Sequence, residues 1–272
     1  LNLVQAKSDT AYESRSADYI LTNNIDLTGL TQAFPKTTFT GTLDGDFHSV
    51  KGLTTCIFSL MEGTSGDVAE VSNAKINNQS QYGMGIVVGQ TYQYTRLYRI
   101  LAVQSSVIGN NCGMLVGTSG KDESDWDVTL RRSNVIEECA SASSSLVAKS
   151  GASVGGMTGF APNVYIKNCL SVQSSVSGGN HRGGFIGHGH RSGYDNMENN
   201  YYAGNASGAV GGMQGTVQGN ADIWSTIRLF KNNYYDSTLI GKVESTTPEH
   251  GIARTTEQLI GENSEIAVNF KA

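Results

Sequence analysis

Short, mostly apolar stretches flanked by glycine recur along this chain, between segments rich in serine, threonine and asparagine. Each block has three residues between two glycines, as in Gly113-Met-Leu-Val-Gly117. The blocks begin at Gly85, Gly113, Gly155, Gly183 and Gly211. The first two and the last three are 28 residues apart, and an interval of 42 residues separates the two groups. A constant period of this length indicates repeated structural units that each pack on their neighbours.

A second set of positions repeats at a looser interval of 30 to 33 residues. In four successive units, a hydrophobic residue is followed by two polar residues and then by cysteine or asparagine. These segments are Ile136–Cys139, Ile166–Cys169, Met197–Asn200 and Phe230–Asn233. The sequence Val103–Val107 also recurs unchanged at Val172–Val176. Each unit therefore has three parts: a glycine-flanked strand, a strand ending near asparagine or cysteine, and a short strand of serine and valine.

Three short strands per unit, separated by turns, are typical of a parallel β-helix. We therefore predict an all-β fold, a parallel and right-handed β-helix solenoid with three short strands per coil. Stacked coils would place Asn168, Asn199 and Asn232 in an asparagine ladder, with each side chain bonded to the next coil. A β-propeller needs blades of about 40 residues and four strands, so the shorter period argues against it.

The same pattern divides the chain into three parts. Residues 1–17 are predicted to be an N-terminal lead-in, residues 18–241 the β-helix, and residues 242–272 a C-terminal cap or a link to further chain. Within the last part, Thr255–Ile260 has the N-terminal threonine and early glutamate of a short capping helix. Because the chain starts at Leu1 rather than at methionine, we expect a mature protein or an excised fragment.

Composition and charge exclude several classes of function. Charged residues make up 16% of the chain, the net charge is −5, and no basic stripe is present, which argues against a nucleic-acid partner. No apolar run reaches the roughly 18 residues of a spanning helix, so membrane insertion is not expected. The four cysteines have neither the density of a disulfide framework nor the spacing of a zinc site, and we expect them to be small buried residues.

Together, these blocks resemble the GLUG-type repeats of bacterial surface proteins. The resemblance rests on Gly113–Gly117 and Gly184-Phe-Ile-Gly187, each followed by an Asn-Cys or Asn-Asn-Tyr-Tyr strand, and on the strand unit from Tyr19 to Leu53. It extends over about residues 18–260. Such repeats occur in the non-catalytic regions of IgA-peptidase-like proteins and in adhesins. The resemblance implies a β-helical surface module and no catalytic residues.

Departures from the period are where binding groups are expected, because insertions in a solenoid gather on one face. The longest insertion, residues 118–131, carries Trp126 among acidic residues. Trp126 would suit stacking on a sugar ring. Oxygen ligands for calcium would come from Asp122, Asp125 and Asp127, although the EF-hand pattern is absent. A solvated acidic loop is the alternative, and no other cofactor or metal is expected.

A basic cluster follows the fourth glycine block and contains His188, His190 and Arg191. A β-helix that cleaves acidic polysaccharides would need a cation for the carboxylate and a base with a tuned pKa. Simple exposure of loop histidines is the alternative. Asp44 and Asp46 suggest a glycosidase-like pair, but Asp-Gly-Asp is also ordinary turn chemistry.

Two tyrosine pairs occupy matching places on successive coils, Tyr201-Tyr202 and Tyr234-Tyr235. Alternation along a strand puts one member of each pair inside the molecule and one outside. We predict that Tyr202 and Tyr235 point outwards and form an aromatic step for a sugar or a protein surface. The alternative is that both members pack under neighbouring loops.

These observations favour a non-enzymatic β-helical module that is secreted or lies on the cell surface. It would be a stalk, an adhesin or a receptor-binding element that contacts glycans or host proteins. Two alternatives stay open. One is a polysaccharide lyase or glycoside hydrolase built on a β-helix, and the other is a component of a phage tail fibre or tailspike, which would be a trimer. No catalytic residue is assigned, and the oligomeric state is not determined.

Overall fold

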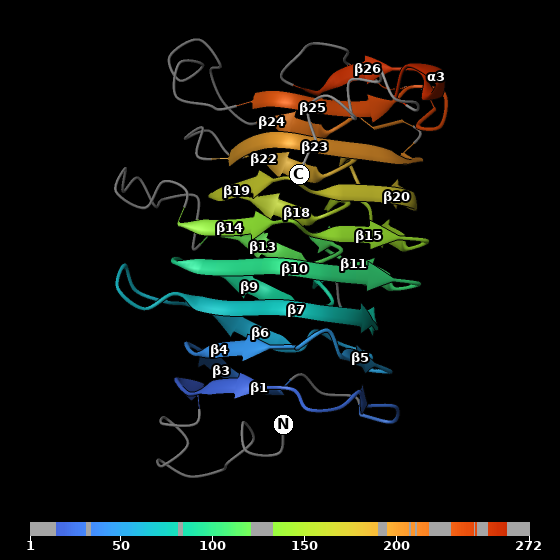
Figure 1. Cartoon of the computed structure of the whole chain (residues 1–272). Helices are drawn as coiled ribbons and strands as arrows, with labels where there is room; N and C mark the ends of the chain where they lie inside the picture. The colour runs from blue at the N-terminus through green and yellow to red at the C-terminus, as the bar shows by residue number, and fades with distance from the viewer. Residues whose placement is uncertain are drawn as a thin grey trace.

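Successive coils of the chain lie one above another and form a solenoid. The computed structural model describes residues 15–30, 34–80, 84–120, 133–189, 195–206, 208–209, 211–217, 230–241, 243 and 250–259. Within these ranges, strands β1 to β26 form three sheets of 16, 7 and 3 strands, whose recorded strand pairings are parallel. The coils rise from the N-terminus at the bottom of Figure 1 to the C-terminal strands at the top. The predicted parallel β-helix is confirmed.

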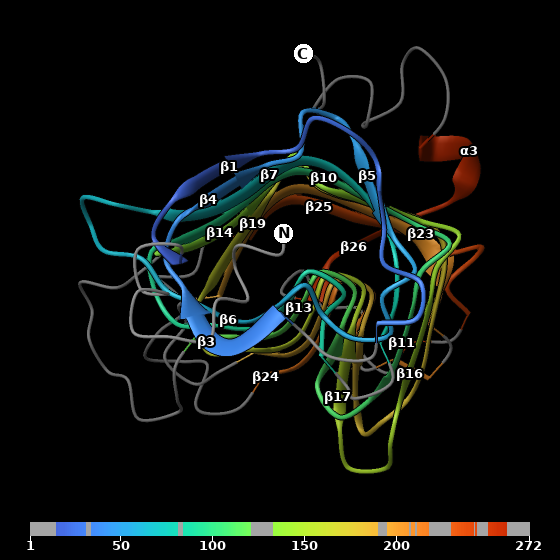
Figure 2. The ribbon, with the colours of Figure 1, turned by 90° about the horizontal axis from the view of Figure 1, so that it is seen from below.

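The fourth coil illustrates the path of the chain. β10 (Thr95–Val103) crosses the front, and β11 (Ser106–Gly109) forms the adjoining side. β12 (Cys112–Gly113) then leads to β13 (Val116–Ser119), which returns along the back. Seen from below in Figure 2, the chain turns clockwise as it recedes from the viewer, so the solenoid is right-handed.

The three sheets correspond to the front and side, the back, and the inner elbow of the coils. The 16-stranded sheet contains β10, β11, β1 (Asp18–Ile20), β2 (Ile25–Asp26), β4 (Thr42–Asp44), β5 (Ser49–Lys51), β7 (Ala69–Asn77), β8 (Gln79–Ser80), β14 (Asn134–Glu137), β15 (Ala140–Ala142), β16 (Ser145–Ala148), β19 (Val164–Lys167), β20 (Leu170–Gly178), β23 (Asp195–Asn205), β25 (Phe230–Asp236) and β26 (Ile252–Arg254). The 7-stranded sheet contains β13, β3 (Phe34–Phe39), β6 (Phe58–Met61), β9 (Val88–Thr91), β18 (Thr158–Ala161), β22 (Ile186–Gly189) and β24 (Gln214–Val217). The 3-stranded sheet contains β12, β17 (Ser153–Gly155) and β21 (His181–Gly183). Each of the later coils thus visits three sheets, although the largest sheet often contributes two strands to one coil.

The looser repeat of 30 to 33 residues is the register of the front sheet. Ile136 pairs with Ile166, Ile166 with Met197, and Met197 with Phe230. Ile136, Ile166 and Met197 are buried, so the hydrophobic residue that opens each segment points into the core. The alignment made from the sequence therefore superposes residues that are true neighbours in space.

One residue per coil has a left-handed backbone at the same corner of the front sheet. These residues are Asn73, Arg99, Glu138, Asn168, Asn199 and Asn232, with φ between 50° and 55°. Asparagine tolerates this conformation better than most residues other than glycine. The predicted ladder is confirmed, because Nδ2 of Asn199 donates to Oδ1 of Asn168 at 3.2 Å, and Nδ2 of Asn232 donates to Oδ1 of Asn199 at 2.9 Å. Lower down, an ion pair of 2.8 Å between Arg99 and Glu138 replaces the amide contacts.

A second ladder runs inside the same corner, through the next residue of each coil. The backbone N–H of Cys139 donates to Sγ of Cys169, and that of Cys169 donates to Oδ1 of Asn200 at 2.9 Å. Nδ2 of Asn200 then donates to Oδ1 of Asn233 at 2.9 Å. All four cysteines of the chain are free and buried, as predicted. The buried amides of Asn200 and Asn233 and the backbone N–H groups of Cys139 and Cys169 are therefore paired from coil to coil.

The glycine blocks mark the elbow where the small sheet meets the back sheet. Gly113 pairs with Gly155, and Gly155 pairs with Gly183. A Cβ atom on Gly155 would lie 2.5 Å from the backbone nitrogen of Gly187, and one on Gly187 would lie 2.4 Å from that of Val154. Backbone thus packs directly on backbone, which leaves no room for side chains and explains why glycine recurs at both ends of each block.

The C-terminal part of the described chain packs on the outside of the last coils. β26 pairs with β25, so parallel pairing extends to Arg254. The predicted helix is present as α3 (Thr256–Leu259). Thr255 precedes it with a capping box, because its Oγ1 accepts the Gln258 N–H at 3.3 Å and its own N–H donates to Oε1 of Gln258 at 2.8 Å. Leu259 is buried against Tyr201 and Tyr234.

Candidate binding surfaces

The two tyrosines predicted to form an outer aromatic step lie in the core. Tyr202 is 0% exposed and Tyr235 is 2% exposed, so the prediction that they point outwards is wrong. A Cβ atom on Gly184 would lie 2.6 Å from Cγ of Tyr202, and one on Gly212 would lie 2.1 Å from Cδ1 of Tyr235. Each ring therefore packs against a glycine of the block that precedes it in the chain, and burial raises the pKa of both phenols.

The left-handed corner explains why the second tyrosine of each pair, rather than the first, points into the core. Uninterrupted alternation from the buried Met197 would put Tyr201 inside and Tyr202 outside. Asn199 occupies the left-handed corner with φ 54°, and the residue after it, Asn200, points into the core instead of outwards. The alternation of strand β23 is shifted by one residue from that point. Tyr201 lies on the outer face, where α3 covers it.

His188 lies in a ring stack at the elbow between the small sheet and the back sheet. Its imidazole is 4.4 Å from that of His181, with 24° between the ring planes, and 5.2 Å from the ring of Phe160. His188 and Phe160 are neighbours in the register of β22 and β18. The stack brings together residues from three strands, and His188 is half-buried within it.

Several predicted site residues lie outside the described part of the chain. These are Trp126, His190, Arg191, Asp122, Asp125 and Asp127. The proposed roles of Trp126 in sugar stacking and of the three aspartates in calcium binding stay predictions. Among the described residues, no group of three or more histidine, cysteine or acidic side chains is arranged to hold a metal ion.

Asp44 and Asp46 form a turn. Oδ1 of Asp44 accepts the backbone N–H of Asp46 at 2.9 Å and Nδ2 of Asn73 at 3.1 Å. Asp46 itself has φ 42°. The first carboxylate is therefore occupied in fixing the turn and the neighbouring coil, as expected for the turn alternative.

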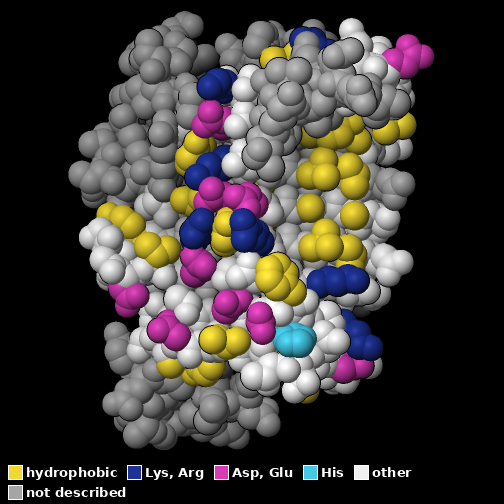
Figure 3. Space-filling view, viewed as in Figure 1, with side chains coloured by type: hydrophobic (Ala, Val, Ile, Leu, Met, Phe, Trp, Pro, Cys, Tyr) yellow, Lys and Arg dark blue, Asp and Glu magenta, His cyan; other side chains and the backbone are white. Residues whose placement is uncertain are grey.

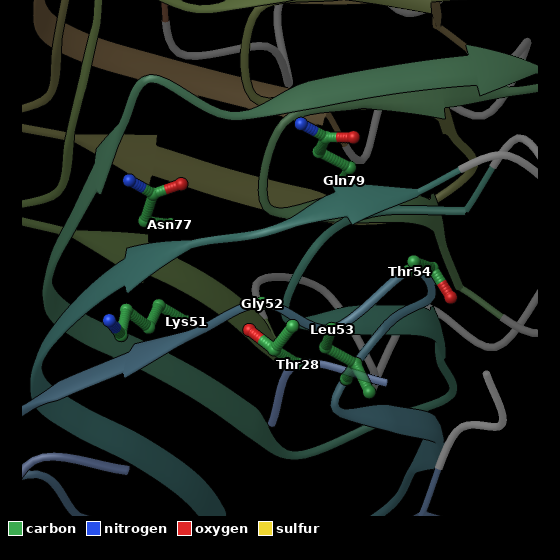
Figure 4. A pocket seen from close by; sticks show the side chains of 7 residues that line it. All are labelled: Thr28, Lys51, Gly52, Leu53, Thr54, Asn77 and Gln79. Carbon is green, nitrogen blue, oxygen red and sulfur yellow. The ribbon is translucent and has the colours of Figure 1, made fainter. Parts of the chain in front are cut away.

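A polar pocket of about 290 Å³ lies at the corner after β5, on the lower coils. Figure 4 shows its lining from β5 and from both sides of the β7–β8 corner. The residues are Thr28, Lys51, Gly52, Leu53, Thr54, Asn77 and Gln79. The pocket is open to solvent, and its side chains are mainly amides, hydroxyls and one ammonium group.

Asp26 organises one wall of this pocket. Its carboxylate accepts the Thr28 N–H at 3.0 Å and lies 3.1 Å from Nζ of Lys51. Hydrogen bonds from Thr28, and then the contact with Lys51, lower the pKa of Asp26 to about 2. A Cβ atom on Gly52 would lie 2.3 Å from Oγ1 of Thr28, and the glycine has φ 83°, so only glycine permits this close approach.

The opposite wall offers hydrogen-bonding groups that are not engaged. Within the described ranges, the structure records no partner for the side-chain amides of Asn77 and Gln79. Sequence reasoning missed this pocket because its residues are far apart along the chain. The signal that could have found it is the pairing of Lys51 with Asn77, which follows from aligning the two coils.

A ladder of alternating charge runs up the front face, over strands β10, β14, β19, β23 and β25. The carboxylate of Glu137 is 2.9 Å from Nη2 of Arg96 and 2.7 Å from Nζ of Lys167, and Lys231 lies 3.6 Å from Glu198. Burial alone would raise the pKa of Glu137, but its bonds with Lys167 and Arg96 outweigh burial and lower it. The magenta and blue side chains of this ladder stand out along the centre-left of Figure 3. These charges neutralise one another and bind coil to coil.

Comparison with known proteins supports the fold and leaves the family open. A solved structure of a Bacteroides ovatus protein, described as a putative immunoglobulin A1 protease, matches 96% of this chain and 85% of its own, with a TM-score of 0.66 and 20% sequence identity. At this identity, the likeness concerns the β-helical architecture alone. No protein-family model and no curated protein matches the chain, so the resemblance to GLUG repeats rests on the residues quoted above. No helix in the described ranges has the length and apolarity needed to cross a bilayer.

Proposed function

We propose that this chain is a non-catalytic β-helical binding module that acts outside the cell or on its surface and binds glycans. The observation that carries the proposal is the polar pocket with the unengaged amides of Asn77 and Gln79. Amides and hydroxyls at fixed positions are the groups that recognise sugar hydroxyls, and Lys51 is already neutralised by Asp26. This chemistry favours a neutral, hydroxyl-rich ligand over an acidic one.

The repeated residues of the chain favour a non-catalytic role. The residues that recur from coil to coil, the glycines and the corner asparagines, are occupied in building the coil. The fold-level likeness to the Bacteroides ovatus protein and the resemblance to GLUG repeats support a bacterial surface or secreted setting. An adhesin or stalk that presents its lateral face to a glycan is consistent with these features.

A glycan array followed by isothermal titration calorimetry tests the proposal. We expect a neutral oligosaccharide to bind the purified chain, and the double variant N77A/Q79A to weaken that binding at least tenfold. Asn110→Ala, an exposed asparagine remote from the pocket, is the matched control and should leave the Kd unchanged. Absence of binding across the array would overturn glycan recognition and leave a spacer role.

The histidine stack supports a second candidate function, cleavage of a polysaccharide. The half-buried imidazole of His188 is the kind of group that acts as a general base or acid, and the ring of His181 stacked on it holds it in place. Incubation with acidic and neutral polysaccharides, followed by product sizing, tests this role. Cleavage that is lost in His188→Ala would support it, and no cleavage of any polymer would remove it.

A further inference from the structure

The front sheet carries an apolar strip on its outer face, beside the charge ladder. It consists of two neighbouring columns of outward side chains on three successive coils. They are Leu101, Ala140 and Leu170 in one column, and Val103, Ala142 and Val172 in the other. Leu101 is 39% exposed and Leu170 is 37% exposed. Hydrophobic side chains accordingly gather over β10, β15 and β20 on the right of Figure 3.

The chain itself already covers the upper end of these columns. Leu170 pairs with Tyr201, and Val172 pairs with Ala203, in the coil above. There, Leu259 of α3 packs on Tyr201 and Ala203, and Val172 is packed against the same cluster. The exposed strip therefore continues into an apolar surface that α3 covers in the coil above. Contiguous apolar surface of this kind marks a contact with another molecule.

The order of side-chain sizes along the strip is the same from either end. Small alanines on the middle coil lie between leucine and valine below and leucine and valine above. A twofold axis that lies between the two facing sheets, parallel to the strands at the level of Ala140 and Ala142, would bring Leu101 of one copy onto Leu170 of the other. The alanines would let the two sheets approach, because facing sheets pack about 10 Å apart with modest side chains between them.

Charges at the two ends of the strip fit the same axis. Lys75 pairs with Leu101 and forms the exposed lower boundary, and the exposed Glu257 lies in α3 at the upper boundary. The structure records no ion pair for either side chain within the described ranges. An antiparallel arrangement places Lys75 of one copy towards Glu257 of the other, at both ends of the contact.

We propose that two copies of this chain associate through the apolar strip, in an isologous and antiparallel side-by-side dimer. A twofold contact uses the same patch on both copies, which the self-matching order of residues satisfies. The strip is small and mostly aliphatic, so we expect a reversible dimer with a Kd on the order of 1–100 µM.

Sedimentation velocity from about 1 to 300 µM, a range set around that expected Kd, tests the proposal on the chain itself. We expect the molar mass to rise from monomer to dimer, and Leu101→Asp and Leu170→Asp each to weaken association at least tenfold. Ile20→Asp is the matched control, since Ile20 is 67% exposed on β1, well below the strip. Circular dichroism checks that each variant keeps its fold.

An exchange of the charges at Lys75 and Glu257 tests the same dimer without altering the leucines. Lys75→Glu and Glu257→Lys should each weaken the dimer several-fold, and combining them should restore it. A wild-type chain that stays monomeric up to the highest concentration would overturn the proposal. So would a trimer, equal losses in the Ile20→Asp control, or a double charge variant weaker than both single variants.

Discussion

Asn199 occupies the middle of the outer asparagine ladder and shows what single residues contribute to the coil. Its side-chain Nδ2 donates to Asn168 and its side-chain Oδ1 accepts from Asn232, while its backbone has φ 54°. The same residue thus connects three coils and provides the bend of its own coil. Arg99 and Glu138 have the same left-handed backbone with longer side chains. The bend therefore does not require asparagine, and the asparagines stabilise it through their hydrogen bonds.

Replacement of Asn199 separates these two contributions. We expect Asn199→Ala to lower the free energy of unfolding by about 2 kcal/mol, because it removes two hydrogen bonds and replaces asparagine with a residue that tolerates a left-handed backbone less well. Asn199→Gly removes the same hydrogen bonds but accepts the backbone, so it should cost about 1 kcal/mol less. Urea unfolding followed by circular dichroism measures both values. Equal losses in the two variants would show that backbone strain has no part in the effect.

At the scale of elements, the unit of this fold is the elbow made by a strand of the small sheet and the following strand of the back sheet. β17 and β18, like β21 and β22, run so close that backbone atoms are in contact. Each elbow also packs on the elbow of the next coil, because a Cβ atom on Gly155 would lie 2.5 Å from the backbone nitrogen of Gly187. The glycine period is therefore a packing requirement shared by several strands.

A methyl group at one elbow should be enough to disturb this packing. In Gly187→Ala, the new Cβ would lie 2.4 Å from the backbone nitrogen of Val154, and neither backbone can move without shifting its coil. We expect a loss of about 3 kcal/mol or more in the free energy of unfolding. Gly66→Ala is the control, because its Cβ would meet nothing within 4 Å. The idea fails if thermal unfolding shows similar stability for the two variants.

At the scale of the whole molecule, the core is a narrow stack that contains ionisable groups with raised pKa values. Burial raises the pKa of the Cys112 thiol to about 12, and it also raises that of Cys56 and Cys169. Outside this core, burial under α3 and then the charge of Asp236 raise the pKa of Tyr201 to about 12. Each group stays protonated in the folded chain at a pH where the unfolded chain has lost the proton.

Stability should accordingly fall on the alkaline side. An unfolded thiol ionises near its ordinary value of 9.0, so the stabilisation is complete below that pH and is lost as the pH rises towards the folded value of about 12. The loss is about 1.4 kcal/mol per buried thiol for each pH unit above 9. Urea midpoints between pH 7 and 10.5 measure this slope. The triple variant C56A/C112A/C169A should have a shallower slope, and an unchanged slope would exclude the thiols as its source.

Much of the architecture followed from the chain alone, because its determinants are local or strictly periodic. The glycine blocks, the corner asparagines and the Thr255 capping box each report a backbone conformation that few other residues accept. Repetition then adds register, since equivalent residues must stack on one another. The ladder of Asn168, Asn199 and Asn232 therefore follows from the sequence.

The surfaces were decided by the tertiary structure. One left-handed residue, Asn199, shifts the alternation of its strand and turns Tyr202 into the core, which no count along the strand reveals. The polar pocket and the apolar strip join side chains that are about one coil apart in the chain but adjacent in space. A periodic sequence determines which residues build the coil, whereas the groups that face a partner depend on how the corners bend and how the coils stack.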